Sequence, residues 1–322
     1  MVFIKNKMKK IEVMIRNIKI SGPRYLIWDV LYQLTKLFHK RKPEIIKKSK
    51  IIKKKVNNYE MFIDSNGKGI HRDLKLHGTR ESVSLEIVKS ILKEGDVVLD
   101  ASANIGYYVI LESLAVGSNG IVYAVEPVKK SFNLLKKNIE LNRLENVKTY
   151  NLAFNDKLGR LDINIESESN LNTPVKIKIN GNKKTESVKA TTLDSFLKGK
   201  KKPNFMRMDI EGFEDVVFQG GEKTLDSLKT IFVELHFPLL GKERMKRLLH
   251  NLKGKGFEVH KAVLEWERWE DESSLSGRIV NYLHRKRSRP LVFDNMTIES
   301  LLRNKNFMEG HHSLEVFFVK NR

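Results

Sequence analysis

The stretch Val97–Gly106, VVLDASANIG, decides the fold that this chain is expected to adopt. Its three leading apolar residues predict a short buried strand that ends at Asp100. The small residues that follow predict a sharp turn into a helix, because they let the backbone approach a ligand closely. A second apolar run, Ile121–Val125, ends in Glu126, 20 residues after Gly106. This combination is typical of an α/β site for a nucleoside, with the acidic side chain on the ribose hydroxyls.

The turn lacks most of the glycines of a phosphate-binding loop. The dinucleotide fingerprint G-x-G-x-x-G needs three glycines, and only Gly106 is present, so a dinucleotide is disfavoured. A βα turn that binds no ligand is the alternative. The pattern D-x-[small]-x-N-x-G followed by E-P resembles the S-adenosylmethionine site of class I methyltransferases, where a sulfonium and an amino acid replace the pyrophosphate.

Motifs further along the chain sharpen this resemblance. The segments LDASANIGYYVI, VYAVEP, a helix ending in NIELN at 138–142, and MDIEGFE at 208–214 occur in this order. Together they resemble the FkbM family over residues 77–240 and a final strand. The resemblance implies an α/β fold of the Rossmann-like class I methyltransferase type, with a seven-stranded, mostly parallel sheet and helices on both faces. It also implies transfer of a methyl group from S-adenosylmethionine to an oxygen, usually a hydroxyl of a sugar or polyketide.

The same resemblance implies a set of contacts around the methionine and ribose of the cofactor. Asp100 and Asn104 would face the methionine end, Gly106 would allow close approach, and Glu126 would bind the ribose hydroxyls. Ser102 occupies a position where the family usually has glycine, which tolerates positive φ. Its position in the turn makes Ser102 a predicted cofactor contact. Because a Cβ there could strain the turn, a methyltransferase-like binding protein without catalytic turnover is an alternative function.

The adenine end of the cofactor is expected at the end of the third strand. There the resemblance places the base against Ala153 to Asp156, with Asp156 or a backbone amide at its amino group. Glu81, just before a predicted helix at 82–93, is a further implied contact. A surface or helix-capping role is the alternative for Glu81.

Two strand ends supply the candidate catalytic groups. Asp209 and Glu211 follow the predicted fourth strand, and Glu234 and His236 close the fifth. Ligands of open α/β sheets bind at the carboxyl ends of the strands, and alternate residues of an extended chain point the same way. His236 is the leading candidate for the general base, with a pKa expected to be raised by the nearby carboxylates. A divalent-metal site and a purely structural hydrogen-bonded cluster are the alternatives.

One absent motif narrows the choice of acceptor. Methyltransferases that modify amino groups of nucleic acids usually carry Asn/Asp-Pro-Pro-aromatic after the fourth strand, and this chain reads DIEG at 209–212. Methylation of an exocyclic base nitrogen is therefore disfavoured. The leading hypothesis is methylation of a hydroxyl of a glycan, glycolipid or related small molecule, with an RNA methyltransferase as the alternative.

Alternating strand and helix patterns predict a methyltransferase domain over residues 59–322, after a basic helical extension at 1–58. An inserted β-hairpin is expected at about 159–190, from alternation at 161–165 and 175–179 and the turn Asn180-Gly181. A second insertion, about 265–312, is expected to cap the acceptor site, its tryptophans forming a sugar-binding surface or anchoring an ordinary helix. Strands are expected at 97–100, 121–126, 147–153, 205–209, 230–236, 257–263 and 314–320.

The net charge of +21 is concentrated in the appendages. Residues 1–55 contain 17 Lys/Arg and three acidic residues, and they include an expected amphipathic helix at Tyr25–Phe38 that is too short to span a membrane. Three roles are open for it: packing on the core or a partner, contact with an anionic membrane, or binding of nucleic acid. The expected location is cytoplasmic, and a peripheral position at the inner face of the membrane is one of the roles left open. The lack of cysteine fits a reducing compartment.

Overall fold

The structure is a computed structural model that describes residues 23–38, 48–165, 184–265, 275–287, 289–308 and 313–320. Several predicted features lie outside these residues. They include the strand at 175–179 with its Asn-Gly turn, the tryptophans Trp266 and Trp269, and the lysines at 40–42.

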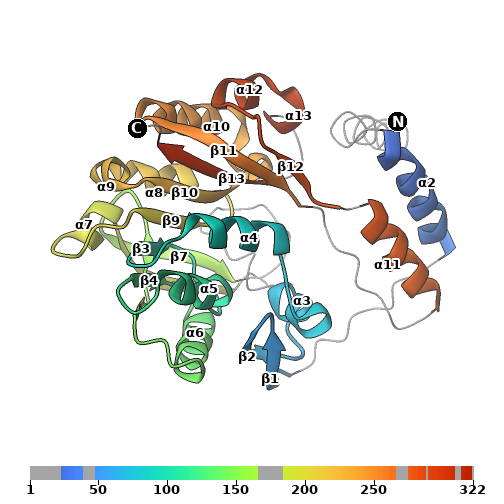
Figure 1. Cartoon of the computed structure of the whole chain (residues 1–322), viewed down its shortest axis with the longest axis horizontal. Helices are drawn as coiled ribbons and strands as arrows, with labels where there is room; N and C mark the ends of the chain where they lie inside the picture. Colours follow the sequence, from blue (N-terminus) through green and yellow to red (C-terminus); the bar gives the residue numbers. More distant parts are fainter. Residues whose placement is uncertain are drawn as a thin grey trace.

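An eight-stranded sheet forms the centre of the molecule (Figure 1). The five strands from β10 to β5 pair in parallel, whereas β13 runs antiparallel to both β10 and β11, and β12 antiparallel to β11. In order across the sheet, the strands are β12 (Leu291–Phe293), β11 (Phe257–Leu264), β13 (Ser313–Lys320), β10 (Thr230–His236), β9 (Phe205–Met208), β3 (Val97–Asp100), β4 (Ile121–Val125) and β5 (Val147–Tyr150).

This order and the single reversed strand inside the parallel set confirm the predicted α/β, Rossmann-like class I architecture. The seven predicted strands are all present, and the predicted count is corrected to eight by β12. This edge strand lies in the insertion at 265–312 and pairs with Ala262–Leu264. It has only three residues, which is too short to give a periodic signal in the sequence.

Helices cover both faces of the sheet because successive side chains of each strand point to opposite sides. In β3, Val97 and Leu99 belong to one buried cluster and Val98 to the other. The first cluster contains residues of α7 (Leu193–Leu197), α8 (Glu214–Gln219), α9 (Glu222–Ser227), α10 (Phe237–Gly254), α12 (Ile298–Arg303) and α13 (Lys305–Met308). The second contains residues of α3 (Ile70–His77), α4 (Ser82–Ile91), α5 (Tyr107–Val116) and α6 (Lys129–Leu141).

The expected inserted hairpin is present as an antiparallel pair. Its strands β7 (Gly159–Ile165) and β8 (Lys184–Thr191) pair from Gly159 with Ala190 to Ile165 with Lys184. The short strand β6 (Ala153–Phe154) joins β8 in parallel, which makes a separate three-stranded sheet. The hairpin is therefore anchored directly beside the predicted adenine position.

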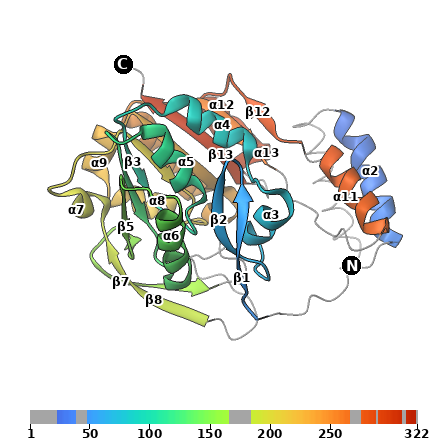
Figure 2. The same ribbon diagram turned by 60° about the horizontal axis from the view of Figure 1, so that its bottom comes forward.

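The N-terminal extension contains both a helix and a strand. The amphipathic helix α2 (Pro23–Phe38) lies beside α11 (Leu275–Arg287), apart from the main sheet in both views (Figures 1 and 2). The last residues of the extension expected at 1–58 form β1 (Ile51–Val56), which pairs with β2 (Tyr59–Asp64). This part of the extension is therefore a strand and not helical, and its last residue, Val56, is fully buried in the core. None of the described helices combines the length and apolar character needed to cross a lipid bilayer.

Asn138 of α6 joins the β1–β2 hairpin to the turn after β3. Its side chain is fully buried, accepts a hydrogen bond from the Phe62 amide at 2.6 Å and donates to the Phe62 carbonyl at 3.2 Å. It also donates to the carbonyl of Ile105 at 2.8 Å. One buried amide thus satisfies three backbone groups and holds the residue that precedes Gly106.

We expect Asn138→Ala to lower the free energy of unfolding by about 2–4 kcal/mol, because it leaves three buried backbone groups without partners. Urea denaturation measures the change. Asn142→Ala is the matched control, since Asn142 also bonds β2, at the Glu60 carbonyl, but at an exposed position. Equal losses in the two variants would contradict the role given to Asn138.

Candidate functional site

The turn after β3 is held by backbone groups and by the buried carboxylate of Asp100. Asp100 is fully buried and accepts a hydrogen bond from the Ser102 amide at 3.2 Å, while the Ala103 amide donates to the Val125 carbonyl at 2.9 Å. Gly106 begins α5 with a φ of 91°, and a Cβ there would lie 2.8 Å from Leu135 Cδ1. Gly106 is thus required both for its backbone conformation and for the packing of α6.

Glu126 lies at the end of β4 and faces the same turn. One carboxylate oxygen accepts a hydrogen bond from the Asn104 amide at 2.9 Å, and the other from the Val128 amide at 2.8 Å. Burial raises the pKa of Glu126 to about 8 despite these two bonds. Among the described residues no cation forms an ion pair with this carboxylate, and Glu126 lines a cavity.

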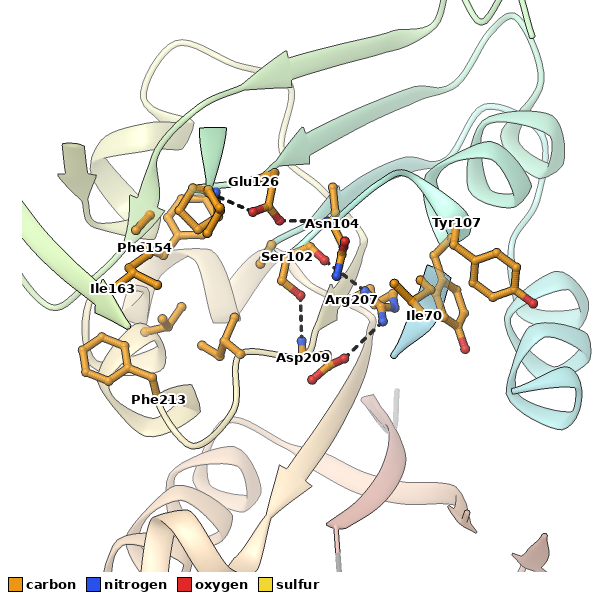
Figure 3. Close-up of a pocket in the computed structure, with 18 of the residues that line it drawn as sticks. Ile70, Ser102, Asn104, Tyr107, Glu126, Phe154, Ile163, Arg207, Asp209 and Phe213 are labelled. Atoms are coloured by element: carbon orange, nitrogen blue, oxygen red, sulfur yellow. Dashed lines mark hydrogen bonds and ion pairs between the residues drawn. The ribbon is translucent and has the colours of Figure 1, made fainter. Parts of the chain in front are cut away.

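The cavity lies over the carboxyl ends of β3, β4 and β9 (Figure 3). Its lining contains six of the residues predicted from the sequence, which are Glu81, Ser102, Asn104, Glu126, Ala153 and Asp209. Apolar side chains close the end next to the inserted hairpin, namely Phe154, Leu161, Ile163, Phe213 and Val217. This end offers flat and branched hydrocarbon surface of the kind that an aromatic base contacts.

Other predicted residues lie outside this lining. Asp100 and Gly106 stand behind the turn and position it rather than face the cavity. Asp156 is exposed and does not line the cavity, because the chain leaves the site after the two-residue strand β6. Asn155, not Asp156, is the buried polar residue that directly follows the cavity residue Phe154 in the sequence.

Glu81 is a buried ion-pair partner and not a helix cap. It has no capping hydrogen bond, pairs with Arg80 and accepts a hydrogen bond from the Tyr108 hydroxyl at 2.9 Å. Burial would raise the pKa of Glu81, but Arg80 and Arg207 outweigh it and hold that pKa below its usual value. Arg80 and both tyrosines at 107 and 108 also line the cavity. Glu81 therefore brings a fixed negative charge to this wall.

Arg207 is a central site residue that the sequence reasoning missed. It lies on β9 with its guanidinium 3.4 Å from Asp100 Oδ1, 3.7 Å from Asp209 Oδ2 and 4.0 Å from the centre of the Tyr108 ring. It lines the cavity and is buried. A signal was present, because a lone charge between Met206 and Met208 in a central strand must be paired to be buried.

His236 is surrounded by carboxylates. Its Nδ1 lies 2.8 Å from Glu214 Oε1, and its Nε2 lies 3.2 Å from Glu211 Oε2, 3.6 Å from Glu234 Oε1 and 3.8 Å from Asp209 Oδ1. Burial alone would lower the pKa of His236, but Glu234, Glu211 and Glu214 hold it well above its usual value. The predicted grouping and the predicted direction of the pKa shift are both present, and Glu214 is an added member.

Only one acid of this cluster reaches the cavity. Asp209 lines it, whereas His236 and Glu211 do not. Burial first, and then Glu234, raise the pKa of Asp209 to about 7, against the opposing effects of His236 and Arg207. Asp209 thus has an affinity for protons suited to exchange near neutral pH.

The same cluster has the donor types of a hard divalent cation. Within the described part of the chain, Asp209, Glu234 and His236 each offer one ligand atom, and these atoms lie within 4.8 Å of one another. Glu214 on Nδ1 would orient the ring for a cation at Nε2. A cation and a proton at Nε2 exclude each other, so the two interpretations of the cluster differ in what they predict.

Comparison with known proteins places the chain in a family. The model of the methyltransferase FkbM domain matches residues 100–286, more than half of the chain. The chain belongs to the FkbM methyltransferase family. Over 70 residues it is 36% identical to a Saccharolobus solfataricus protein named "Probable cobalt-precorrin-6B C(15)-methyltransferase (decarboxylating)", a match that covers 21% of this chain and 35% of that protein. The chain thus spans about a third of the length of that curated relative.

Solved structures with a similar arrangement are distant in sequence. M. jannaschii TYW2 in complex with AdoMet is 16% identical, with a TM-score of 0.40 over 86% of this chain and 90% of that one. Precorrin-6y C5,15-methyltransferase from Geobacter metallireducens GS-15 is 12% identical, with a TM-score of 0.40 over 74% and 86%. The fold class rests on the strand order of the sheet and not on these likenesses.

Ser102, where the FkbM family usually has glycine, fits its turn without a left-handed backbone. In the described residues the positive φ values of this turn belong to Asn104, at 46°, and to Gly106. The Ser102 Oγ accepts a hydrogen bond from the Asp209 amide at 3.2 Å and so joins the ends of β3 and β9. The backbone strain expected from a Cβ at this position is therefore absent.

We expect Glu126→Gln to weaken binding of S-adenosylmethionine by about 1–3 kcal/mol, because the charged acceptor for the ribose hydroxyls is lost. The raised pKa of Glu126 also predicts the direction in which cofactor affinity changes with pH. Affinity of the unmodified FkbM protein should increase as the pH rises through about 8 and Glu126 ionises, and the variant should lose this increase. Titration calorimetry at several pH values measures both effects.

Glu60→Gln is the control, because Glu60 is an exposed carboxylate that pairs with Lys53 outside the cavity. It should leave the affinity and its pH dependence unchanged. An unaltered affinity in Glu126→Gln would remove Glu126 from the ribose.

Proposed function

We propose that this FkbM protein is an S-adenosylmethionine-dependent O-methyltransferase. The observation that carries the proposal is the position of Glu126, a buried carboxylate at the end of the second parallel strand that faces a cavity shared with Ser102, Asn104 and Asp209. These groups fit the cofactor. Glu126 would bind the ribose hydroxyls, the turn at Ser102 and Asn104 the methionine end, and the apolar end beside Phe154 the adenine.

The chain's own residues supply positioning and proton transfer. S-adenosylmethionine, when bound, supplies an electrophilic methyl group on a sulfonium. Arg207 and Ser102 fix Asp209 at the cavity wall, where its carboxylate can accept the proton of an acceptor hydroxyl as the oxygen attacks the methyl group. The imidazolium of His236 lies behind Asp209 and stabilises the ionised form of that carboxylate. This assignment moves the role of base from His236 to Asp209, with His236 and Glu211 as its support.

The residues after β9 support one class of acceptor. Asp209-Ile210-Glu211-Gly212 contains no proline pair to receive an exocyclic amino group, and its first carboxylate suits a hydroxyl. We infer a hydroxyl of a glycan, a glycolipid or a related small molecule. An RNA hydroxyl is the alternative, since the basic segments outside the core suit phosphates.

Incubation with labelled S-adenosylmethionine tests the acceptor class. We expect transfer of label to cell-envelope glycolipid or soluble glycan of the source organism, and no transfer to total RNA. Label in RNA alone would overturn the glycan proposal. Cofactor binding by calorimetry with no label in any fraction would instead support the binding-only alternative.

We expect Asp209→Asn to lower kcat by about 100-fold or more with little change in cofactor affinity, because a positioned base is lost. Protonated Asp209 cannot act as a base, and its pKa is about 7. We therefore expect kcat at saturating cofactor to rise with pH through about 7 in the unmodified protein. Glu211→Gln is the control, since Glu211 contacts His236 but does not line the cavity. This variant should lower kcat less than Asp209→Asn does.

The metal interpretation predicts a different pattern. It requires loss of activity with a chelator and recovery with magnesium or manganese. Activity that is indifferent to chelator, together with the loss in Asp209→Asn, supports the base. Retention of more than about a tenth of kcat in that variant would contradict it.

A further inference from the structure

The helix α2 has two apolar faces, and in the described part of the chain only one of them packs against another element. Its inner face carries Trp28 and Tyr32, which pack against Val280 and Leu283 of α11. The Tyr32 ring also lies 5.4 Å from that of His284. The opposite face carries five exposed aliphatic side chains at helical spacing, which are Leu26, Ile27, Val30, Leu31 and Leu34. We call these five residues the outer stripe.

The outer stripe is contiguous and strongly exposed. Ile27 is 62% exposed and Leu34 50%, and the positions recur at intervals of three or four residues along one side of the helix. Single exposed leucines are ordinary on a protein surface, but a row of five on one helix face marks an interaction site. The helices α2 and α11 lie side by side in both views (Figures 1 and 2), and the stripe residues are not among those that pack between them.

The sequence on either side of the stripe, within residues 1–55, is strongly positive. The one acid of α2, Asp29, is buried and accepts a hydrogen bond from Gln33. The neighbouring helix α11 has no acid, and Lys286 lies 5.5 Å over the Tyr282 ring. Residues 1–55 contain 17 Lys/Arg and three acids. The occupant of the stripe must therefore be apolar where it meets the helix and negatively charged around it.

We propose that the outer stripe docks on the surface of an anionic lipid bilayer. The aliphatic side chains would enter the boundary between headgroups and acyl chains, and the lysine-rich flanking sequences would face the negative headgroups. A second copy of the chain would bring two strongly positive surfaces together, and nucleic acid offers no apolar surface for five aliphatic side chains. An anionic bilayer matches both the apolar and the charged part.

The location of this element suits the site. Strands β10 and β11 run in the same direction because each is antiparallel to β13. Their carboxyl ends, near His236 and Leu264, therefore lie at the same end of the sheet. The insertion that carries α11 leaves the sheet from that end. The docking element is thus joined to the end of the sheet that holds the cavity.

Vesicle sedimentation with the full chain tests the proposal. We expect binding to phosphatidylglycerol-containing vesicles, weaker binding to pure phosphatidylcholine, and loss of binding as salt is raised. The triple variant Ile27→Gln, Leu31→Gln, Leu34→Gln should bind at least about tenfold more weakly, because interfacial binding scales with buried apolar area. The double variant Leu114→Gln, Leu158→Gln is the matched control, since both leucines are exposed elsewhere, and it should bind like the unmodified chain.

A site-specific probe keeps the test independent of folding and of activity. The chain has no cysteine, so Ile27→Cys and Leu158→Cys can each carry one environment-sensitive fluorophore. A blue shift with anionic vesicles is expected at position 27 and not at position 158. Equal behaviour of the two positions, or vesicle binding by the triple variant equal to that of the unmodified chain, would overturn the proposal. Binding of RNA without binding of vesicles, or a dimer abolished by the triple variant, would do the same.

Discussion

The buried guanidinium of Arg207 is the interaction on which the rest of the site depends. It lies between Asp100 and Asp209 at the ends of two adjacent strands and rests on the ring of Tyr108. Two carboxylates buried this close to each other would be strongly disfavoured without a cation, because each loses its hydration. Arg207 therefore allows β3 and β9 to end side by side, where the hydrogen bond from the Asp209 amide to Ser102 completes the cavity wall.

The acids of the site differ in charge at neutral pH because their neighbours differ. Glu81 has Arg80 beside it and a lowered pKa, whereas Glu126 has only backbone amides and a pKa of about 8. Asp209 lies between these cases, with a pKa of about 7, because a cation and further acids act on it together. Groups whose environments separate their pKa values can divide the work of binding and proton transfer. The fold thus gives one carboxylate a fixed charge and leaves another able to exchange a proton.

The sequence predicted what depends on local pattern and missed what depends on contact between distant segments. The seven strands and Glu126 follow from periodicity and from the spacing of strand, turn and acid. Arg207 and Glu214 were missed because each pairs with a side chain that is distant in the sequence, Asp100 and His236 respectively. The apolar neighbours of Arg207 were the local sign that its charge is buried. Asp156 was placed at the adenine by its position after a strand, but that strand has only two residues and the chain then turns outward. The concern over Ser102 assumed a left-handed backbone that the turn assigns to Asn104 and Gly106 instead.

The direction of the strands relates both appendages, the helices α2 and α11, to the end of the sheet that holds the site. The helix α2 and the helix α11 come from opposite ends of the chain, yet each covers the inner face of the other. In the sequence, α11 follows β11, which ends at Leu264 at the same end of the sheet where β10 ends in His236. A surface-binding element needs no such attachment if the acceptor arrives from free solution. Its attachment at this end of the sheet suits an acceptor presented by a membrane, so the proposed docking face favours a glycolipid over a soluble sugar as the proposed acceptor.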